Sequence, residues 1–211
     1  MRQEDLDLAG RCVSGDCTAQ RELFRRERSR VQATLYRILG SNHDMEDLVQ
    51  EAFIEIFRSL ASFRGEARLG TWLDKITVRV ACAYLSRRRP KVARLEAVPE
   101  IPDGDANAEE RAMAREAARR AYTLLDRLDV HKRVAFSLHA IDGRPLAEVA
   151  RLMDASLVAT KVRVWRARRE MERRADRDPV LRSFLEPEGG GAPASSARRG
   201  AGIHPPGGAD A

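Results

Sequence analysis

The chain has 211 residues and a formal net charge of +6, with 33% charged and only 5% aromatic residues. This length allows one or two compact domains, and the scarcity of aromatic residues argues against an aromatic-rich β-sandwich. A positive balance favours a polyanionic partner, but only four of the 38 basic residues are lysines, so the arginine excess runs through the whole chain and does not identify that partner.

The N-terminal part of the sequence predicts four helices. Apolar residues recur three and four positions apart, and no segment alternates as a strand would. Thr18 is placed to cap the second helix and Gly40 to end it, Asp44 is placed to cap the third, and Pro90 must end the fourth. The predicted helices cover about 4–13, 18–39, 45–60 and 71–89.

A change in composition separates this part from a second helical part. Residues 91–107 carry prolines and acids without periodicity, which is typical of a flexible linker. The Gly-, Pro- and Ala-rich residues 187–211 predict a disordered C-terminal tail. We therefore expect an all-α protein with two small helical domains, 1–90 and 108–178. The helices predicted in the second domain cover about 108–127, 130–141, 146–153 and 157–177.

The last two of these helices predict a helix-turn-helix motif. Only Asp154-Ala155-Ser156 separates them; Asp tolerates the left-handed backbone that such a turn needs, and Ser156 can cap the second helix. That helix contains the basic run TKVRVWRARRE, and its small apolar stripe of Thr160, Val164, Ala167 and Met171 can pack inward. The opposite stripe would enter the major groove of DNA, and its residues are Val158, Lys161, Val162, Trp165, Arg166 and Arg169.

Two simpler interpretations also fit this basic helix. One is a plain antiparallel helix pair with an arginine-rich outer face. The other is a membrane-surface helix, which would need bulkier apolar residues than its inner stripe supplies.

Two polar surfaces are predicted in the first domain. In HDMEDLVQEAFIEIFRSL (43–60), an exposed acidic stripe is suited to a basic partner, although a solvated helix face has the same pattern. In FRGEARLGTWLDKITVRV (63–80), aromatic residues alternate with basic ones, as single-stranded nucleic acid requires. The alternative is that Trp72 and Phe63 are core residues.

The sequence contains no pattern that predicts catalysis or metal binding. The three cysteines form no CxxC pair and the four histidines are scattered, so we expect reduced thiols, no metal, no cofactor and no enzyme activity. No run approaches 18 apolar residues and no signal peptide is visible. We therefore expect a cytoplasmic protein that does not insert into a membrane.

Several segments resemble bacterial RNA polymerase sigma factors of the extracytoplasmic-function group. GDCTA, MEDLVQEAFIEIF, FRGEARLGTWLDKI and SRRR are similar to their second conserved region. LDRLDVHKRVAFSLHAIDGRPLAEVARLMDASLVATKVRVWRARREM is similar to their fourth region, and the whole resemblance covers roughly residues 4–177. It implies a transcription initiation factor that binds core RNA polymerase and promoter DNA, as duplex and as melted strand, and is held inactive by an anti-sigma factor.

The resemblance also assigns roles to residues. One surface would dock on core polymerase, with the residues Asp47, Leu48, Gln50 and Glu51. A second would bind the opened minus-10 element and hold a flipped base, with the residues Phe63, Arg64, Trp72, Lys75 and Arg79. The outer stripe of the last helix would read the minus-35 duplex.

Several positions depart from the family pattern, and two of them bear on promoter opening. Arg79 and Ala83 stand where the family often has Asn and Asp in the strand-opening helix. Two alternatives therefore stay open at this point: a sigma-like interaction protein without promoter activity, and a helix-turn-helix regulator that binds duplex operators and never joins the polymerase.

Overall fold

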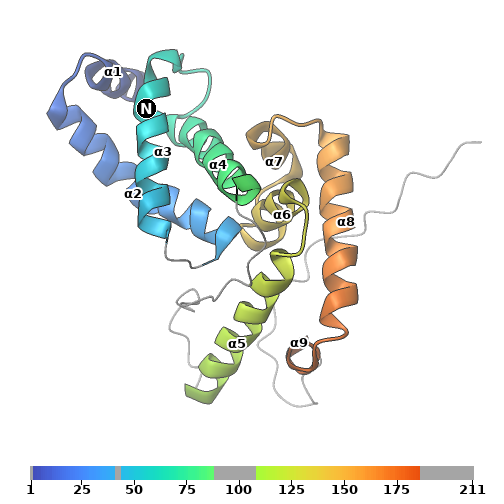
Figure 1. The fold of residues 1–211 in the computed structure, drawn as a ribbon. Coiled ribbons are helices and arrows are strands. Elements are labelled where there is room, and N and C mark those ends of the chain that lie inside the picture. Colours follow the sequence, from blue (N-terminus) through green and yellow to red (C-terminus); the bar gives the residue numbers. More distant parts are fainter. Residues whose placement is uncertain (1, 41–43, 88–107, 186–211) are drawn as a thin grey trace, which may run out of the picture.

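All regular secondary structure in the described part of the chain is helical, as the apolar periodicity predicts. The computed structural model describes residues 2–40, 44–87 and 108–185, so the predicted linker and tail lie outside the described residues. Figure 1 shows two groups of helices side by side, α1–α4 and α5–α9. The bounds are α1 (Arg2–Val13), α2 (Cys17–Leu39), α3 (Met45–Ser59), η1 (Leu60–Ser62), α4 (Leu69–Arg87), α5 (Ala108–Leu125), α6 (Val130–Phe136), the π-helical turn η2 (Ser137–Ile141), α7 (Leu146–Leu152), α8 (Leu157–Ala175) and α9 (Pro179–Leu185).

The long helix α2 forms the centre of the N-terminal half, where it packs against α1, α3 and α4. Its N-cap is Asp16 and not Thr18, so the cap prediction was wrong. The Asp16 carboxylate accepts hydrogen bonds from the backbone N–H groups of Thr18 (2.8 Å) and Ala19 (3.1 Å). A carboxylate that accepts two of the free N–H groups of the first turn satisfies them better than one hydroxyl could. The C-terminal end is as predicted, because Gly40 has a φ of 74°.

Helix α3 begins after Asp44, but the side chain of Asp44 does not cap it. Instead, the Asp44 carboxylate accepts a hydrogen bond of 2.6 Å from the hydroxyl of Tyr84 on α4. This contact ties the start of α3 to the end of α4. The predicted role of Asp44 as a cap was therefore right in position and wrong in its hydrogen bond.

The C-terminal half contains one helix, α9, that the sequence pattern did not predict. Asp178 caps it by accepting hydrogen bonds from the N–H groups of Val180 and Leu181, and Pro179 occupies the first helical position. Leu181 is buried against Ala117 and Leu124 of α5. Seven residues are too few to show a helical period, so this helix depends on its cap and its packing.

The two halves share one hydrophobic core, a contact that the sequence pattern did not indicate. Val134, Leu138 and Val149 of the second half belong to the same buried cluster as Leu35 and Leu73 of the first. Helix α6 packs on α4, and the turn η2 packs on α2. The helix-turn-helix is thereby held against α4, which positions the two candidate DNA-binding surfaces relative to each other.

None of the helices in the described ranges is long and apolar enough to cross a bilayer. Among the same residues, no group of three or more His, Cys, Asp or Glu side chains is arranged to hold a metal ion. Cys12 is buried, Cys17 is exposed, Cys82 is partly buried, and all three are free thiols.

Candidate nucleic-acid interface

The helix-turn-helix is formed by α7, a four-residue turn and α8. Asp154 is the one non-glycine residue with a positive φ (48°) in the described part of the chain, which confirms the left-handed turn position. The N–H of Ala155 donates to the carbonyl of Ala150 (2.9 Å) and closes the end of α7. Ser156 caps α8 as predicted, because its hydroxyl accepts a hydrogen bond from the N–H of Ala159 (3.1 Å). These local bonds determine the direction in which α8 leaves the turn.

Helix α8 has the two faces that its sequence predicts. Thr160, Val164 and Ala167 are buried, so this stripe holds α8 on the rest of the second half. The opposite stripe is open to solvent: Val158 is 71% exposed, Trp165 51% and Val162 40%. Its basic members Lys161, Arg166 and Arg169 are exposed as well. The structure therefore brings all six predicted minus-35 residues onto one accessible face.

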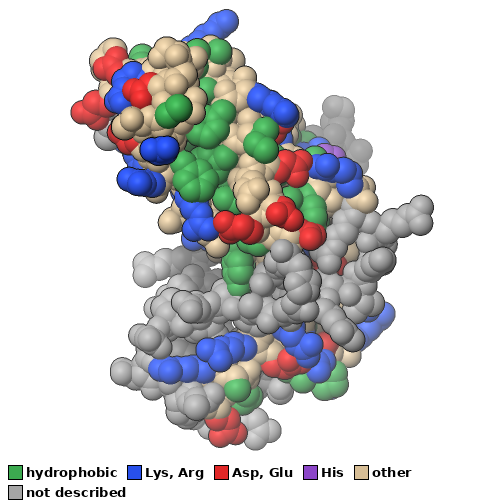
Figure 2. All heavy atoms as spheres, turned by 60° about the vertical axis from the view of Figure 1, so that its left-hand side comes forward, with side chains coloured by type: hydrophobic (Ala, Val, Ile, Leu, Met, Phe, Trp, Pro, Cys, Tyr) green, Lys and Arg blue, Asp and Glu red, His purple; other side chains and the backbone are tan. Residues whose placement is uncertain are grey.

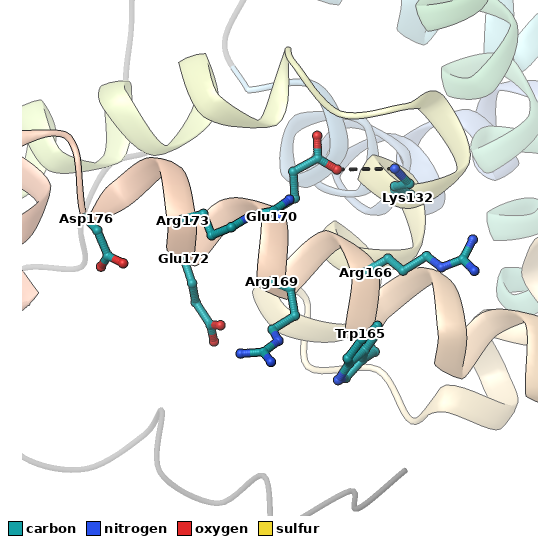
Figure 3. A pocket seen from close by; sticks show the side chains of 8 residues that line it. All are labelled: Lys132, Trp165, Arg166, Arg169, Glu170, Glu172, Arg173 and Asp176. Atoms are coloured by element: carbon teal, nitrogen blue, oxygen red, sulfur yellow. Dashed lines mark hydrogen bonds and ion pairs between the residues drawn. The ribbon is translucent and has the colours of Figure 1, made fainter. Parts of the chain in front are cut away.

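A groove of about 640 Å³ runs along the C-terminal half of this face. Figure 3 shows Trp165 and Arg169 on one side of α8, with the guanidinium carbon of Arg169 lying 5.8 Å from the centroid of the Trp165 ring. On the other side, the Lys132 ammonium and a Glu170 carboxylate oxygen are 3.2 Å apart. Glu172 and Asp176 add acids toward the end of the helix. The part of α8 that suits a polyanion is consequently its N-terminal two thirds.

The aromatic–basic surface of the first half lies around the loop between η1 and α4. The Phe63 and Trp72 rings meet edge to face, with centroids 5.6 Å apart. Phe63 is only 9% exposed, so the ring packs against Trp72 instead of standing free in the loop. Together with Arg64, the two rings line a small cavity of about 270 Å³. Three of the five predicted minus-10 residues are thus brought together.

The other two, Lys75 and Arg79, lie one turn apart on α4, and both contact a carboxylate of the protein itself. Both form ion pairs with Asp154 of the helix-turn-helix, and the Arg79–Asp154 contact is 3.0 Å long. Hydrogen bonds from Lys75 and then Arg79 keep the pKa of Asp154 below its usual value. A cavity of about 630 Å³ separates α7 from the loop beside this contact. In this arrangement a carboxylate of the protein pairs with the two cations that we expected to contact the opened minus-10 strand.

A buried ion network joins the two halves beneath that contact. Asp74 of α4, 1% exposed, accepts two hydrogen bonds from Arg30 (2.9 and 2.8 Å) and one from Arg144 (2.7 Å). Arg144 also donates to Asp142 and Glu148. Burial alone would lower the pKa of Arg144, but its hydrogen bonds to Asp74 and Asp142 outweigh this and raise it. The network thus pairs Arg144 of the second half with Asp74 of the first and fastens the two halves together.

Another arginine, which is fully buried, attaches α6 to the end of α2. Arg133, 2% exposed, donates to the carbonyl oxygens of Ile38 and Leu39, both at 2.9 Å, and pairs with Asp126. The last carbonyls of a helix have no partner within the helix, and a cation there also complements the helix dipole. The sequence pattern did not indicate the roles of Arg133, Arg144 and Asp74. The available signal was a charged residue within an otherwise apolar face, as at Asp74 between Leu73 and Ile76.

The predicted polymerase-docking residues lie on α3, and three of the four are accessible. Asp47 and Gln50 are exposed, and Glu51 is partly exposed and pairs with Arg87 at 2.7 Å. Leu48 is the exception, because its side chain is buried in the core and cannot contact a partner directly. On the face drawn in Figure 2, acidic side chains gather at the lower edge of the N-terminal half, below exposed hydrophobic ones.

Comparisons with known proteins agree with the two-part division of the chain. The family model for sigma-70 region 2 matches residues 23–91, and the model for sigma-70 region 4 matches residues 118–171. The extracytoplasmic-function (ECF) RNA polymerase sigma-E factor of Escherichia coli is 31% identical over 187 residues, which cover 84% of this chain and 96% of that protein.

Solved structures with the same helical arrangement were also found. CnrH, in complex with the cytosolic domain of CnrY, is 25% identical with a TM-score of 0.57, and the match covers 82% of this chain and 98% of CnrH. The sigma factor RpoE of Bartonella quintana, in complex with the anti-sigma factor NepR, is 20% identical with a TM-score of 0.52 over 75% of this chain and 97% of that one. At that identity the second likeness concerns the fold alone.

Proposed function

The chain belongs to the extracytoplasmic-function sigma factors of RNA polymerase, and from that premise we propose how its described surfaces share the work of transcription initiation. A sigma factor binds core RNA polymerase and directs it to promoters, which is the function of this protein. Because phosphodiester bonds are formed by the polymerase, the chain needs no catalytic group of its own. Its place of action is where the polymerase works, in the cytoplasm.

The outer face of α8 reads the minus-35 element as duplex DNA. The observation that carries this assignment is that Lys161, Arg166 and Arg169 are exposed, and none of them pairs with an acid among the described residues. The motif would place the N-terminal half of α8 in the major groove, while later arginines contact phosphates. Side chains that are already free lose no internal ion pair when DNA arrives.

The exposed acidic part of α3 docks on core polymerase. Asp47 and Gln50 project from the first two turns into solvent, where a basic helix of a partner can reach them. Leu48 supports this surface from below by filling the core and is not itself a contact. Glu51 is available once its ion pair with Arg87 opens.

The surface around Phe63, Arg64 and Trp72 binds the opened minus-10 strand, and Lys75 and Arg79 hold its phosphates. The small cavity beside Phe63 and Trp72 supports this assignment, because an extruded base needs an aromatic-lined recess. In the described arrangement Asp154 competes for Lys75 and Arg79, so a DNA strand has to displace it. We therefore interpret this arrangement as the resting state of the free factor.

An anti-sigma factor is the regulatory partner that we propose. The support is that two solved structures of this fold each hold a second protein, which is CnrY in the CnrH complex and the anti-sigma factor NepR in the Bartonella quintana RpoE complex. A protein that holds the two halves together would keep Lys75 and Arg79 covered. This partner would act on the same junction that Asp154 occupies.

Transcription in vitro with purified core polymerase tests the proposal. The full chain should produce transcripts from specific promoters that core polymerase alone does not produce. A protein that binds duplex DNA but neither joins core polymerase nor changes its transcripts would instead be a conventional helix-turn-helix regulator.

A second arm of this experiment tests the division between surfaces. Asp47→Asn combined with Gln50→Ala should weaken binding to core polymerase and leave binding to duplex minus-35 DNA unchanged. Equal loss of both activities would mean that the pair supports the fold and is not a docking surface.

A further inference from the structure

The outer face of α8 contains an apolar feature that phosphate binding does not explain. Large hydrophobic side chains are exposed at eight described positions, and four of these lie on α8, namely Leu157, Val158, Val162 and Trp165. The others are on separate elements, as single surface hydrophobic residues normally are. Val158 is the most exposed of all eight. A group of this kind marks a contact surface.

The two valines occupy the part of α8 that enters the groove in a helix-turn-helix. Val158 and Val162 are four residues apart, on the first two turns after the Ser156 cap, and so lie on one side of the helix. Lys161 lies between them, and Arg166 follows one turn later. A surface that alternates short apolar side chains with unpaired cations is complementary to a polyanion that also presents apolar groups. It matches an apolar protein surface poorly, because the cations would be desolvated without a partner.

Only one base offers a valine something to contact in the major groove. Thymine presents a C5 methyl group there, whereas the major-groove edges of guanine, adenine and cytosine present hydrogen-bonding groups. A valine side chain has no donor or acceptor, so pressing it against those polar edges would leave them unsatisfied at a cost. We propose that Val158 and Val162 read thymine methyl groups in the minus-35 duplex. This inference rests on the proposed function of α8.

The spacing of the two valines constrains where those thymines lie. A separation of four residues corresponds to a rise of about 6 Å along the helix. Base pairs are stacked about 3.4 Å apart along each strand. The thymines are therefore expected on adjacent or next-adjacent base pairs of the minus-35 element, on either strand.

Replacement of thymine by deoxyuridine tests this inference, because it removes the methyl group alone. Duplex promoters are first selected from a random library with the holoenzyme formed by the full chain and core polymerase. Each thymine of the selected minus-35 element is then replaced singly. At one or two neighbouring positions the affinity should fall about three- to fivefold, the size expected for one buried methyl group. With Val158→Ala or Val162→Ala, the penalty at the matching position should disappear.

The controls separate this inference from the proposed function. Val13→Ala removes an equally small exposed side chain on α1 and should leave the deoxyuridine profile unchanged. If the holoenzyme selects no sequence, the proposed function has failed and not only the inference about thymine. If it selects a sequence that binds equally well with deoxyuridine, the inference is overturned. It is also overturned if the valine variants weaken binding to core polymerase or a protein partner and leave the deoxyuridine profile intact.

Discussion

The two candidate DNA surfaces of this protein differ in whether their cations are already paired with an acid of the protein. On α8, the cations around Val158 and Val162 face solvent with no described acid against them. On α4, Lys75 and Arg79 are already paired with Asp154. The acid that covers one surface lies in the turn that leads into the other. Moving the helix-turn-helix off α4 would expose Lys75 and Arg79, so the geometry couples the two proposed DNA-binding surfaces.

Removal of the buried carboxylate that joins the halves should have the largest effect. Asp74→Ala removes a carboxylate that accepts three hydrogen bonds and leaves Arg144 with only the carboxylates of Asp142 and Glu148, so it should lower the free energy of unfolding by about 3 kcal/mol. Chemical denaturation followed by circular dichroism measures this. Glu55→Ala is the matched control, because the Glu55–Arg58 pair is exposed and its loss should cost less than about 1 kcal/mol. A loss for Asp74→Ala as small as the control's would mean that the junction does not depend on this network.

A change on the free surface should have the next largest effect. Arg166→Ala should weaken binding to a minus-35 duplex by about 1–3 kcal/mol if the guanidinium reads a base, and Lys161→Ala should behave in the same way. Fluorescence anisotropy with duplex DNA at fixed salt measures the change. Arg25→Ala, an exposed arginine on α2, controls for the loss of one positive charge. Equal losses for Arg25 and Arg166 would show that the contact is only a general attraction to DNA.

A change on the covered surface should act in the opposite direction. Asp154→Asn removes the charge but tolerates the left-handed backbone, so the turn should persist. The substitution removes two exposed ion pairs, each worth roughly 0.2–1 kcal/mol. Because Lys75 and Arg79 then have no carboxylate to give up, the variant should bind a single-stranded minus-10 oligonucleotide a few times more tightly. Asp176→Asn, at the far end of α8, should change this affinity much less. Unchanged or weaker binding by Asp154→Asn would show that Asp154 does not compete with the DNA strand for Lys75 and Arg79.

Acid should produce the smallest effect, at the same contact. The folded-state pKa of Asp154 is lowered by Lys75 and Arg79, so its contribution to stability is present above the ordinary aspartate pKa of about 4. It is lost as the pH falls through the lowered folded-state value. The difference in unfolding free energy between the wild type and Asp154→Asn should therefore be constant from pH 8 to pH 5. Denaturation at pH 3 should show a smaller difference, and a difference that grows on acidification would contradict the assignment.

Local features of the chain were predicted well because they depend on neighbours in sequence. The period of apolar residues gave the helices and both faces of α8, and Asp154 and Ser156 gave the turn and its cap. Where two candidate groups stand close together, as Asp16 and Thr18 do, the sequence pointed to the wrong one. Leu48 shows the corresponding error for a surface, since a resemblance to a docking helix does not say which of its residues point outward.

The composition and period of the chain were sufficient by themselves to determine an all-α protein with a helix-turn-helix and a basic outer face. Only the tertiary structure decided that Arg133 caps α2, that Asp74 binds Arg30 and Arg144, and that Asp154 covers Lys75 and Arg79. Helix period and caps are set within a few residues, so they leave a local pattern. Ion pairs between residues 44 to 79 positions apart leave none, because packing and desolvation choose the partner only after the helices meet.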